Sequence, residues 1–247
     1  MADLDWLTAR PIAHRGLHDA ARGIIENTAS AFAAAIDAGY GIETDVQLSR
    51  DGDAMVHHDA TLGRLTEGSG RLVDRTAVEL RSVPFRATAD RMMTLGELCE
   101  RIGRRVALAV EIKSAFDRDE RLLARVARVL TDYAGPAAAM SFDPHVVARL
   151  RRLVPDVPRG IVAERHYKAR EWQYLNEWQR CSMAHLLHAP VTRPDFVAYR
   201  VDDLPAPATR LARRIGIPVL TWTVRTPEQR QRAGAWADQM IFEGFRA

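Results

Sequence analysis

The sequence predicts a single (β/α)8 barrel, an α/β fold in which eight parallel strands alternate with helices. A length of 247 residues suits one such barrel, and short apolar runs alternate along the chain with longer helical patterns. Eight of those runs remain once a hairpin return is set aside. No glycine-rich dinucleotide or phosphate loop favours an open, doubly wound sheet instead. We therefore expect one domain, residues 1–247.

The expected strands are short and apolar. They fall at residues 10–14, 41–46, 106–112, 137–141, 159–163, 196–199, 219–223 and 239–242. Asp51 and Gly52 lie between two extended runs, and Asp-Gly in that position is a strong signal for a tight hairpin. Residues 54–57 should therefore return antiparallel to the second strand and stay outside the barrel.

Helical patterns occupy the gaps between these runs. Residues 27–36 resemble a helix, a second short helix starts at Thr94, and an amphipathic helix covers about 118–133. Residues 59–93 contain turn residues without a strong period, so we interpret them as a small insertion after the hairpin. The least regular stretch is 165–195, where we also expect a helix.

Composition excludes several classes of protein. The hydrophobic fraction of 47% is that of a globular chain, and the two cysteines, Cys99 and Cys181, are too few and too far apart for a disulfide framework. The basic residues behind the net charge of +3 are spread out, so no nucleic-acid partner is expected. There is no secretory pattern and no apolar run of about 18 residues. We expect a cytoplasmic monomer or homodimer without stable membrane insertion.

Acidic residues cluster on two expected strands. Because strand side chains alternate, Glu43 and Asp45 share one face, as do Glu111 and Lys113. Carboxylates that meet at the mouth of a barrel repel one another unless a cation lies among them. The oxygen ligands favour a hard divalent cation, Mg²⁺ or Ca²⁺. Lys113 lies beside these acids, where it can neutralise a carboxylate or hold a phosphate oxygen. The alternative to a metal site is an ion-pair network that lines the barrel.

Two histidines end expected strands at the same rim. His14 ends the first strand and is followed by Arg15, and His58 ends the hairpin return. A pair of imidazoles beside a phosphate can divide proton transfer, one taking a proton and the other giving one. Arg15 offers a planar fork suited to phosphate oxygens. By alternation, His57 should point away from the site if His58 points into it.

Eleven short motifs in order resemble the glycerophosphodiester phosphodiesterase family. They are His14-Arg-Gly16, Glu26-Asn-Thr28, Ala31-Phe32, Ile42-Glu-Thr-Asp-Val46, Asp51-Gly52, His58-Asp59, residues 62–66, Thr94-Leu95, Glu111-Ile-Lys113, Ser141-Phe142 and Trp222-Thr-Val224. The resemblance implies a TIM barrel with His14 and His58 as the acid/base pair. It also implies a metal on Glu43, Asp45 and Glu111.

The same resemblance assigns substrate binding to Arg15, Lys113 and Trp222. Two departures stand out. Ile25 replaces a proline that usually precedes the Glu-Asn-Thr motif, and residues 241–245 replace a strand end that is often Thr-Asp. Glu243 is the acid that takes its place, and the larger side chains around it are expected to reshape that wall of the site.

The expected reaction is hydrolysis of a small anionic glycerophosphodiester to sn-glycerol 3-phosphate and an alcohol. The residues leave open whether the nucleophile is water or the glycerol 2-hydroxyl, which would form a cyclic phosphate. One alternative is a phosphodiesterase for lysophospholipids, with an acyl groove formed by the aromatic residues at 172–178 or by Phe242 and Phe245. A second is a non-catalytic barrel that binds phosphorylated ligands.

Overall fold

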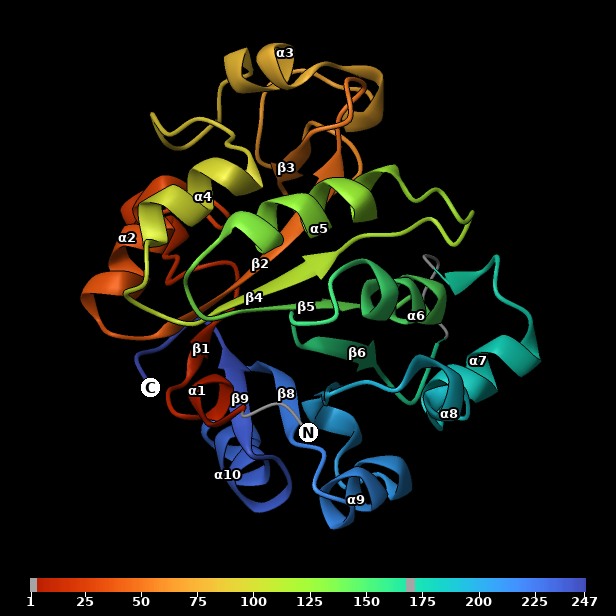
Figure 1. Ribbon diagram of the computed structural model, residues 1–247. Helices are drawn as coiled ribbons and strands as arrows, with labels where there is room; N and C mark the ends of the chain where they lie inside the picture. Colours follow the sequence, from red (N-terminus) through yellow and green to blue (C-terminus); the bar gives the residue numbers. More distant parts are fainter. Residues whose placement is uncertain (1–3, 168–171) are drawn as a thin grey trace.

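Eight parallel strands close into a barrel in the computed structural model, which describes residues 4–167 and 172–247 (Figure 1). The barrel strands are β1 (Ile12–Ala13), β2 (Gly41–Leu48), β4 (Leu108–Ile112), β5 (Ala137–Ser141), β6 (Arg159–Ala163), β7 (Phe196–Arg200), β8 (Val219–Val224) and β9 (Gln239–Phe242). The circle closes because β1 pairs in parallel with both β2 and β9. The predicted fold class is confirmed.

The ninth strand is the predicted hairpin return. β3 (Ala54–Val56) pairs antiparallel with the end of β2, with Val56 opposite Val46. The turn between them contains Gly52 with a φ of 85°, a left-handed conformation that glycine adopts without steric cost. The Asp-Gly signal therefore located the hairpin correctly.

The insertion after the hairpin has a small core of its own. It contains η2 (Leu72–Asp74) and α3 (Ala77–Ser82), and in Figure 1 it lies beyond β3 at the top of the view. Leu62, Leu72, Leu80 and Phe85 are buried together there. Ile25 belongs to the same cluster, so the residue that replaces the expected proline helps to anchor the insertion.

Helices surround the barrel on its outside. In chain order they are α1 (Asp5–Thr8), η1 (Ala20–Arg22), α2 (Ala29–Asp37), α4 (Leu95–Ile102), α5 (Arg121–Asp132), α6 (Pro144–Leu153), α7 (Glu177–Ala184), α8 (Ala189–Thr192), η4 (Val201–Asp203), α9 (Pro207–Arg214) and α10 (Pro227–Trp236). Thr94 is the N-cap of α4, as the predicted helix start implied, and it forms a capping box with Glu97. The irregular stretch 165–195 contains α7 and α8, and its residues 168–171 lie outside the described residues.

The barrel interior is packed with side chains from alternate strand positions. Phe196 is fully buried there, and a Cβ on Gly160 of the neighbouring strand would lie 2.2 Å from its ring. Only glycine at 160 leaves room for that ring. Leu4 and Leu7 belong to the same buried hydrophobic cluster as Phe196.

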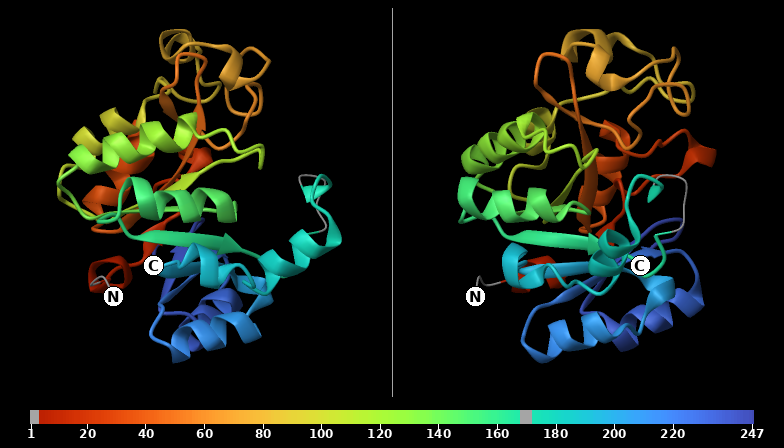
Figure 2. Two further views of the ribbon diagram at one scale, coloured as in Figure 1. Left: turned by 45° about the vertical axis from the view of Figure 1, so that its right-hand side comes forward. Right: turned by 90° about the vertical axis from the view of Figure 1, so that its right-hand side faces the viewer.

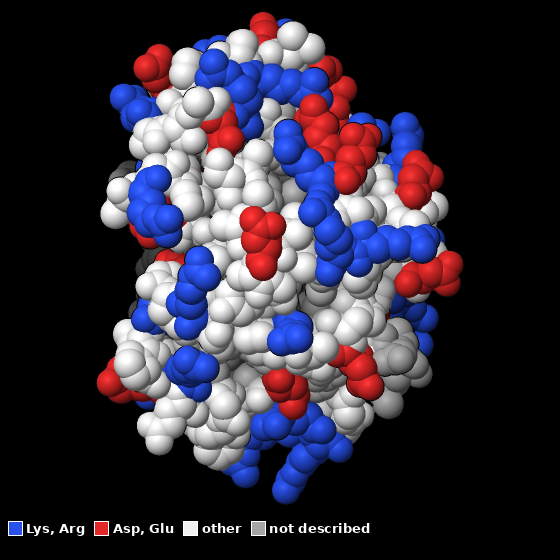
Figure 3. Space-filling model, turned by 90° about the vertical axis from the view of Figure 1, so that its left-hand side faces the viewer, with Lys and Arg blue, Asp and Glu red and all other residues white. Residues whose placement is uncertain are grey.

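The predicted site residues lie at one end of the barrel only. Figure 3 shows the face opposite to the one toward which β4 and β6 point in Figure 1, and its basic and acidic side chains are interspersed. The carboxyl ends of the strands face the viewer in the right-hand view of Figure 2, and this end carries the predicted site residues.

Within residues 4–167 and 172–247, no helix is both long and apolar enough to cross a membrane.

Candidate active site

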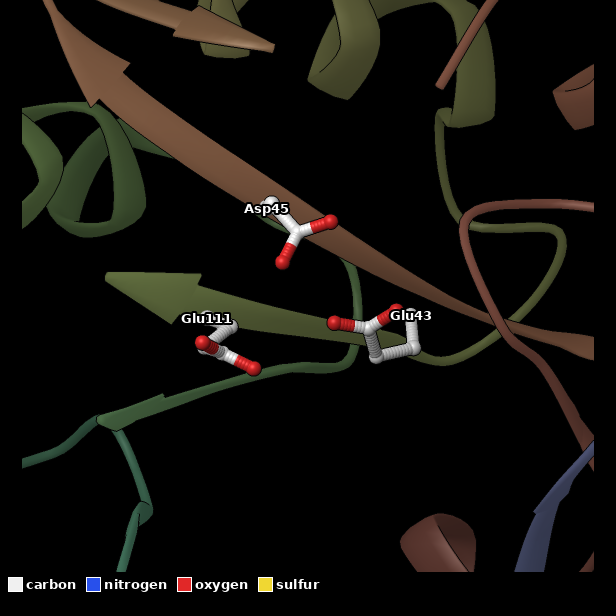
Figure 4. Close-up of side chains that lie close together, drawn as sticks. All are labelled: Glu43, Asp45 and Glu111. Atoms are coloured by element: carbon white, nitrogen blue, oxygen red, sulfur yellow. The ribbon is translucent and has the colours of Figure 1, made fainter. Parts of the chain in front are cut away.

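Three carboxylates from the neighbouring strands β2 and β4 meet at the mouth of the barrel. Glu43 and Asp45 leave β2 on one face, and Glu111 of β4 stands in register with Asp45. Their side chains point toward one another in Figure 4, and one oxygen from each lies within 4.8 Å of the others. All three residues are buried, at 1%, 1% and 8% exposure respectively. The alternation predicted from the sequence brings this carboxylate triad together.

The triad has the properties of a divalent-cation site. Burial, followed by the charges of Asp45 and Glu111, raises the pKa of Glu43 well above its ordinary value. The Oε1 atom of Glu43 is buried and has no hydrogen-bond partner among the residues that the structure describes. A hard cation would satisfy that oxygen and relieve the repulsion, and oxygen ligands are those that Mg²⁺ and Ca²⁺ prefer. The residues present therefore fit such an ion.

Two basic side chains already contact the acids. Lys113 Nζ lies 2.7 Å from Asp45 Oδ1 and 2.5 Å from Glu111 Oε1. Arg15 Nε lies 3.1 Å from Asp45 Oδ2, and its terminal nitrogen lies 2.7 Å from Glu26 Oε1. Burial alone would raise the pKa of Asp45, but Lys113 and Arg15 hold it far below its ordinary value. Both basic residues that were assigned to phosphate thus also neutralise buried carboxylates.

His14 lies between two glutamates. Its Nδ1 is 2.5 Å from Glu243 Oε2, and its Nε2 is 3.9 Å from Glu43 Oε2. Burial lowers the pKa of His14, and the contact with Glu243 opposes that effect. Arg225 Nε donates to the other oxygen of Glu243 at 2.6 Å. Glu243, which the sequence marked as a departure from the usual strand end, thus holds the imidazole and directs Nε2 toward the triad.

His58 is the second histidine at the rim. Its Nδ1 lies 2.7 Å from Asp59 Oδ1, and Arg64 Nε donates to the other oxygen of Asp59 at 2.5 Å. His57 points the other way, as alternation predicted. It is 1% exposed and packs near Phe85, and burial lowers its pKa to about 4.

Asn27 is a site residue that the sequence analysis assigned to a helix. It precedes α2 with a φ of 57°, and its side chain donates to Asp45 Oδ2 at 3.0 Å. Thr44 Oγ1 donates to its carbonyl oxygen at 2.8 Å. The residue type was the clue to this position outside the helix. Asparagine tolerates the left-handed backbone conformation, which the first turn of a helix does not use. Asn27 fixes the orientation of Asp45.

The glycine of the His-Arg-Gly motif has a packing role. Gly16 has a φ of 80°, and a Cβ there would lie 2.8 Å from the backbone of Ala31 in α2. The loop that carries His14 and Arg15 therefore lies directly on the start of that helix. Any side chain at position 16 would push the loop outward.

A cavity of about 900 Å³ lies at the mouth of the barrel and contains the candidate site. Seven of the predicted site residues line it: His14, Arg15, Glu43, His58, Glu111, Lys113 and Trp222. The eighth, Asp45, is almost fully buried behind Lys113 and Arg15. Phe242 contacts both Tyr40 and Phe245, and neither phenylalanine lines this cavity.

Comparison with known proteins identifies the family. The family model described as "Glycerophosphoryl diester phosphodiesterase family" matches residues 14–244. The chain therefore belongs to this family. A relative from Caldanaerobacter subterraneus subsp. tengcongensis, named glycerophosphodiester phosphodiesterase, is 30% identical over 161 residues. That match spans 61% of this chain and 65% of the relative's length.

Solved structures show the same fold along almost the whole chain. A phosphodiesterase from Oleispira antarctica, solved with the product sn-glycerol-3-phosphate, matches with a TM-score of 0.78 and 21% identity. The match covers 96% of this chain and 94% of that one. A putative glycerophosphoryl diester phosphodiesterase from Silicibacter pomeroyi matches with a TM-score of 0.77 and 24% identity, over 94% and 89% of the two chains.

Proposed function

We propose that this protein hydrolyses glycerophosphodiesters to sn-glycerol 3-phosphate and an alcohol, with two histidines transferring protons and a divalent cation on the carboxylate triad. Membership of the family and the enzyme names of the relatives support the reaction. The observation that carries the site assignment is that His14 and His58 share one cavity with Glu43 and Glu111. A barrel active site is expected at these strand ends.

The cation would be held by Glu43, Asp45 and Glu111. When bound, it supplies Lewis-acid charge that polarises a phosphoryl oxygen and lowers the pKa of a hydroxyl. The triad supports this assignment through its spacing and burial and through the unpartnered oxygen of Glu43. Mg²⁺ and Ca²⁺ both suit these oxygen donors.

His14 is assigned as the general base. Because its Nδ1–H donates to Glu243, the lone pair on Nε2 faces the triad and is available to take a proton from the nucleophile. Glu243 would stabilise the imidazolium that forms. Water and the glycerol 2-hydroxyl are both compatible with this base, and a cyclic phosphate among the products would identify the second.

His58 is assigned as the general acid. Asp59 accepts a hydrogen bond from its Nδ1–H and would hold the ring as an imidazolium, whose Nε2–H gives its proton to the alkoxide that leaves. The side chain is 31% exposed, which suits a position where the alcohol departs. Arg15 and Lys113 lie beside the triad and would balance the phosphate charge. Trp222 lines the same cavity and is assigned to substrate contact.

The test is release of sn-glycerol 3-phosphate from glycerophosphocholine and glycerophosphoethanolamine in Mg²⁺, in Ca²⁺ and in EDTA. Glu43→Ala is the control, because it removes one acid of the triad. We expect release that depends on the metal and is lost in the variant. No release from either diester by folded, metal-loaded protein would contradict the proposal, and would favour lysophospholipids or a non-catalytic barrel.

A further inference from the structure

Arg64 extends from the insertion to two loops at the mouth of the barrel. It lies between Leu62, which is buried in the core of the insertion, and Leu65, which packs against that core. Its guanidinium pairs with Glu26, in the loop before α2, and with Asp59, at the start of the insertion. The core of the insertion holds the backbone of Arg64, and the side chain joins two other segments.

All three nitrogens of the Arg64 guanidinium donate hydrogen bonds. Nε donates to Asp59 Oδ2 at 2.5 Å, and Nη1 donates to Glu26 Oε2 at 3.3 Å. Nη2 lies between the two acids and donates to both, at 2.7 Å to Glu26 Oε1 and at 3.2 Å to Asp59 Oδ1. An ammonium could contact both acids, but it could not pair with both oxygens of each one as this planar fork does.

The same two carboxylates contact residues of the proposed reaction. Asp59 Oδ1 also accepts a hydrogen bond from His58 Nδ1 at 2.7 Å, and Glu26 Oε1 also accepts one from Arg15 at 2.7 Å. Arg64 itself does not line the cavity. It lies one contact behind the assigned general acid and one contact behind a residue assigned to phosphate.

The charge of Arg64 also keeps both acids ionised. Burial alone would raise the pKa of Asp59, but hydrogen bonds from His58 and Arg64 hold it well below its ordinary value. Burial would likewise raise the pKa of Glu26, and Arg64 and Arg15 lower it. The ionised form of Asp59 is the one that stabilises an imidazolium at His58.

We propose that Arg64 is a positioning residue that sets the separation of Asp59 and Glu26 and, through them, orients His58 and Arg15 toward one phosphate. The inference rests on the proposed function and adds a residue that acts on the site from outside the cavity. A misplacement of about 1 Å in a reacting geometry can cost roughly 10²-fold in rate, so a contact that supports two site residues has a large effect.

The test compares Arg64→Ala and Arg64→Lys with the matched control Arg81→Ala. Arg81 also belongs to the insertion, and its side chain is 43% exposed against 45% for Arg64. It pairs with Glu97 of α4, which does not line the cavity. Both Arg64 variants should lower kcat for glycerophosphocholine roughly ten- to hundred-fold, with a smaller change in KM. Arg81→Ala should keep the kcat and KM of the wild type.

Chemical rescue separates positioning from a general loss of structure. Millimolar methylguanidinium should restore part of the kcat that Arg64→Ala loses, because it supplies the same planar fork. Methylammonium has the same charge without the fork and should restore less. A wild-type kcat in Arg64→Ala, or equal rescue by the two cations, would overturn the positioning role and leave the proposed reaction intact.

The imidazole NMR signals of His58 report the positioning without any turnover. In substrate-free protein they should shift in Arg64→Ala, return toward the wild-type positions with methylguanidinium, and stay unchanged in Arg81→Ala. That pattern in a protein that hydrolyses no diester would uphold the positioning by Arg64 and contradict the proposed function. Unchanged His58 signals in Arg64→Ala would overturn the inference.

Discussion

Glu243 Oε2 accepts a hydrogen bond from His14 Nδ1 at 2.5 Å, and this contact joins the segment after β9 to the end of β1, where the barrel closes. The other oxygen of Glu243 accepts from Arg225 at 2.6 Å. The carboxylate is thereby held from both sides. A carboxylate there favours the tautomer with the proton on Nδ1, and this leaves the Nε2 lone pair for the proposed role of His14 as general base.

Glu243→Gln should lower kcat roughly 10–100-fold with little change in KM, because an amide can donate to Nδ1 and favour the wrong tautomer. Initial rates of glycerol 3-phosphate release measure both constants. Arg225→Gln is the matched control, since it contacts the same carboxylate without touching His14. A Glu243→Gln enzyme with the kcat of the wild type would show that the contact is structural only.

His58→Ala should cost roughly 10²–10⁴-fold in rate on glycerophosphocholine, where the leaving alkoxide needs a proton. An aryl diester that releases an acidic phenol needs no such proton, so its rate should fall much less. His14→Ala should slow both substrates alike. Equal losses in the His58 variant on the two substrates, or a loss below tenfold on glycerophosphocholine, would refute the assignment of His58 as general acid.

Lys113→Met removes the ammonium between Asp45 and Glu111. Loss of one partner from a buried ion pair costs about 3–5 kcal/mol, so the free energy of unfolding in EDTA should fall by about that amount. Arg50→Met is the comparison, because Arg50 pairs with Glu79 at the surface and such pairs contribute about 0–1 kcal/mol. Urea unfolding with and without Mg²⁺ measures both. Indistinguishable losses in the two variants would count against the triad as a charged cluster.

Burial lowers the pKa of His188 to about 4, below its ordinary value of 6.5. Above pH 6.5 the folded and unfolded states bind the same number of protons at this side chain. As the pH falls from 6.5 to 4, the unfolded state is protonated first, so the folded state loses stability. Because the ring is partly exposed, we expect about 1–2 kcal/mol from this group. His188→Gln should flatten the pH dependence of Tm over this range, and unchanged slopes would contradict the account.

The barrel was predictable because its signals are local. Runs of apolar residues, the Asp51-Gly52 turn and the capping box at Thr94 each depend on a few neighbouring residues. Short helices were harder to predict from the sequence. α3 has only six residues, too few to show a period, although Thr76 and Glu79 form a capping box at its start.

The carboxylate triad followed from strand alternation, but its partners did not. Glu243 and His14 are 229 positions apart in the sequence, and no pattern in the residues around either one predicts their contact. The pairing of Lys113 and Arg15 with Asp45 depends equally on how strands and loops meet in space. These are tertiary contacts. Patterns in a single sequence can therefore indicate which residues belong to the site, but they do not predict which side chains contact one another.

The most direct test titrates Mg²⁺ and Ca²⁺ into wild-type protein and Glu111→Gln protein by calorimetry, and measures glycerol 3-phosphate release by the same samples. The account predicts one divalent ion bound per wild-type chain and the joint loss of binding and hydrolysis in the variant. Hydrolysis that persists in EDTA, or a variant that loses activity while binding the ion as tightly as the wild type, would contradict the carboxylate triad as the metal site of a phosphodiesterase.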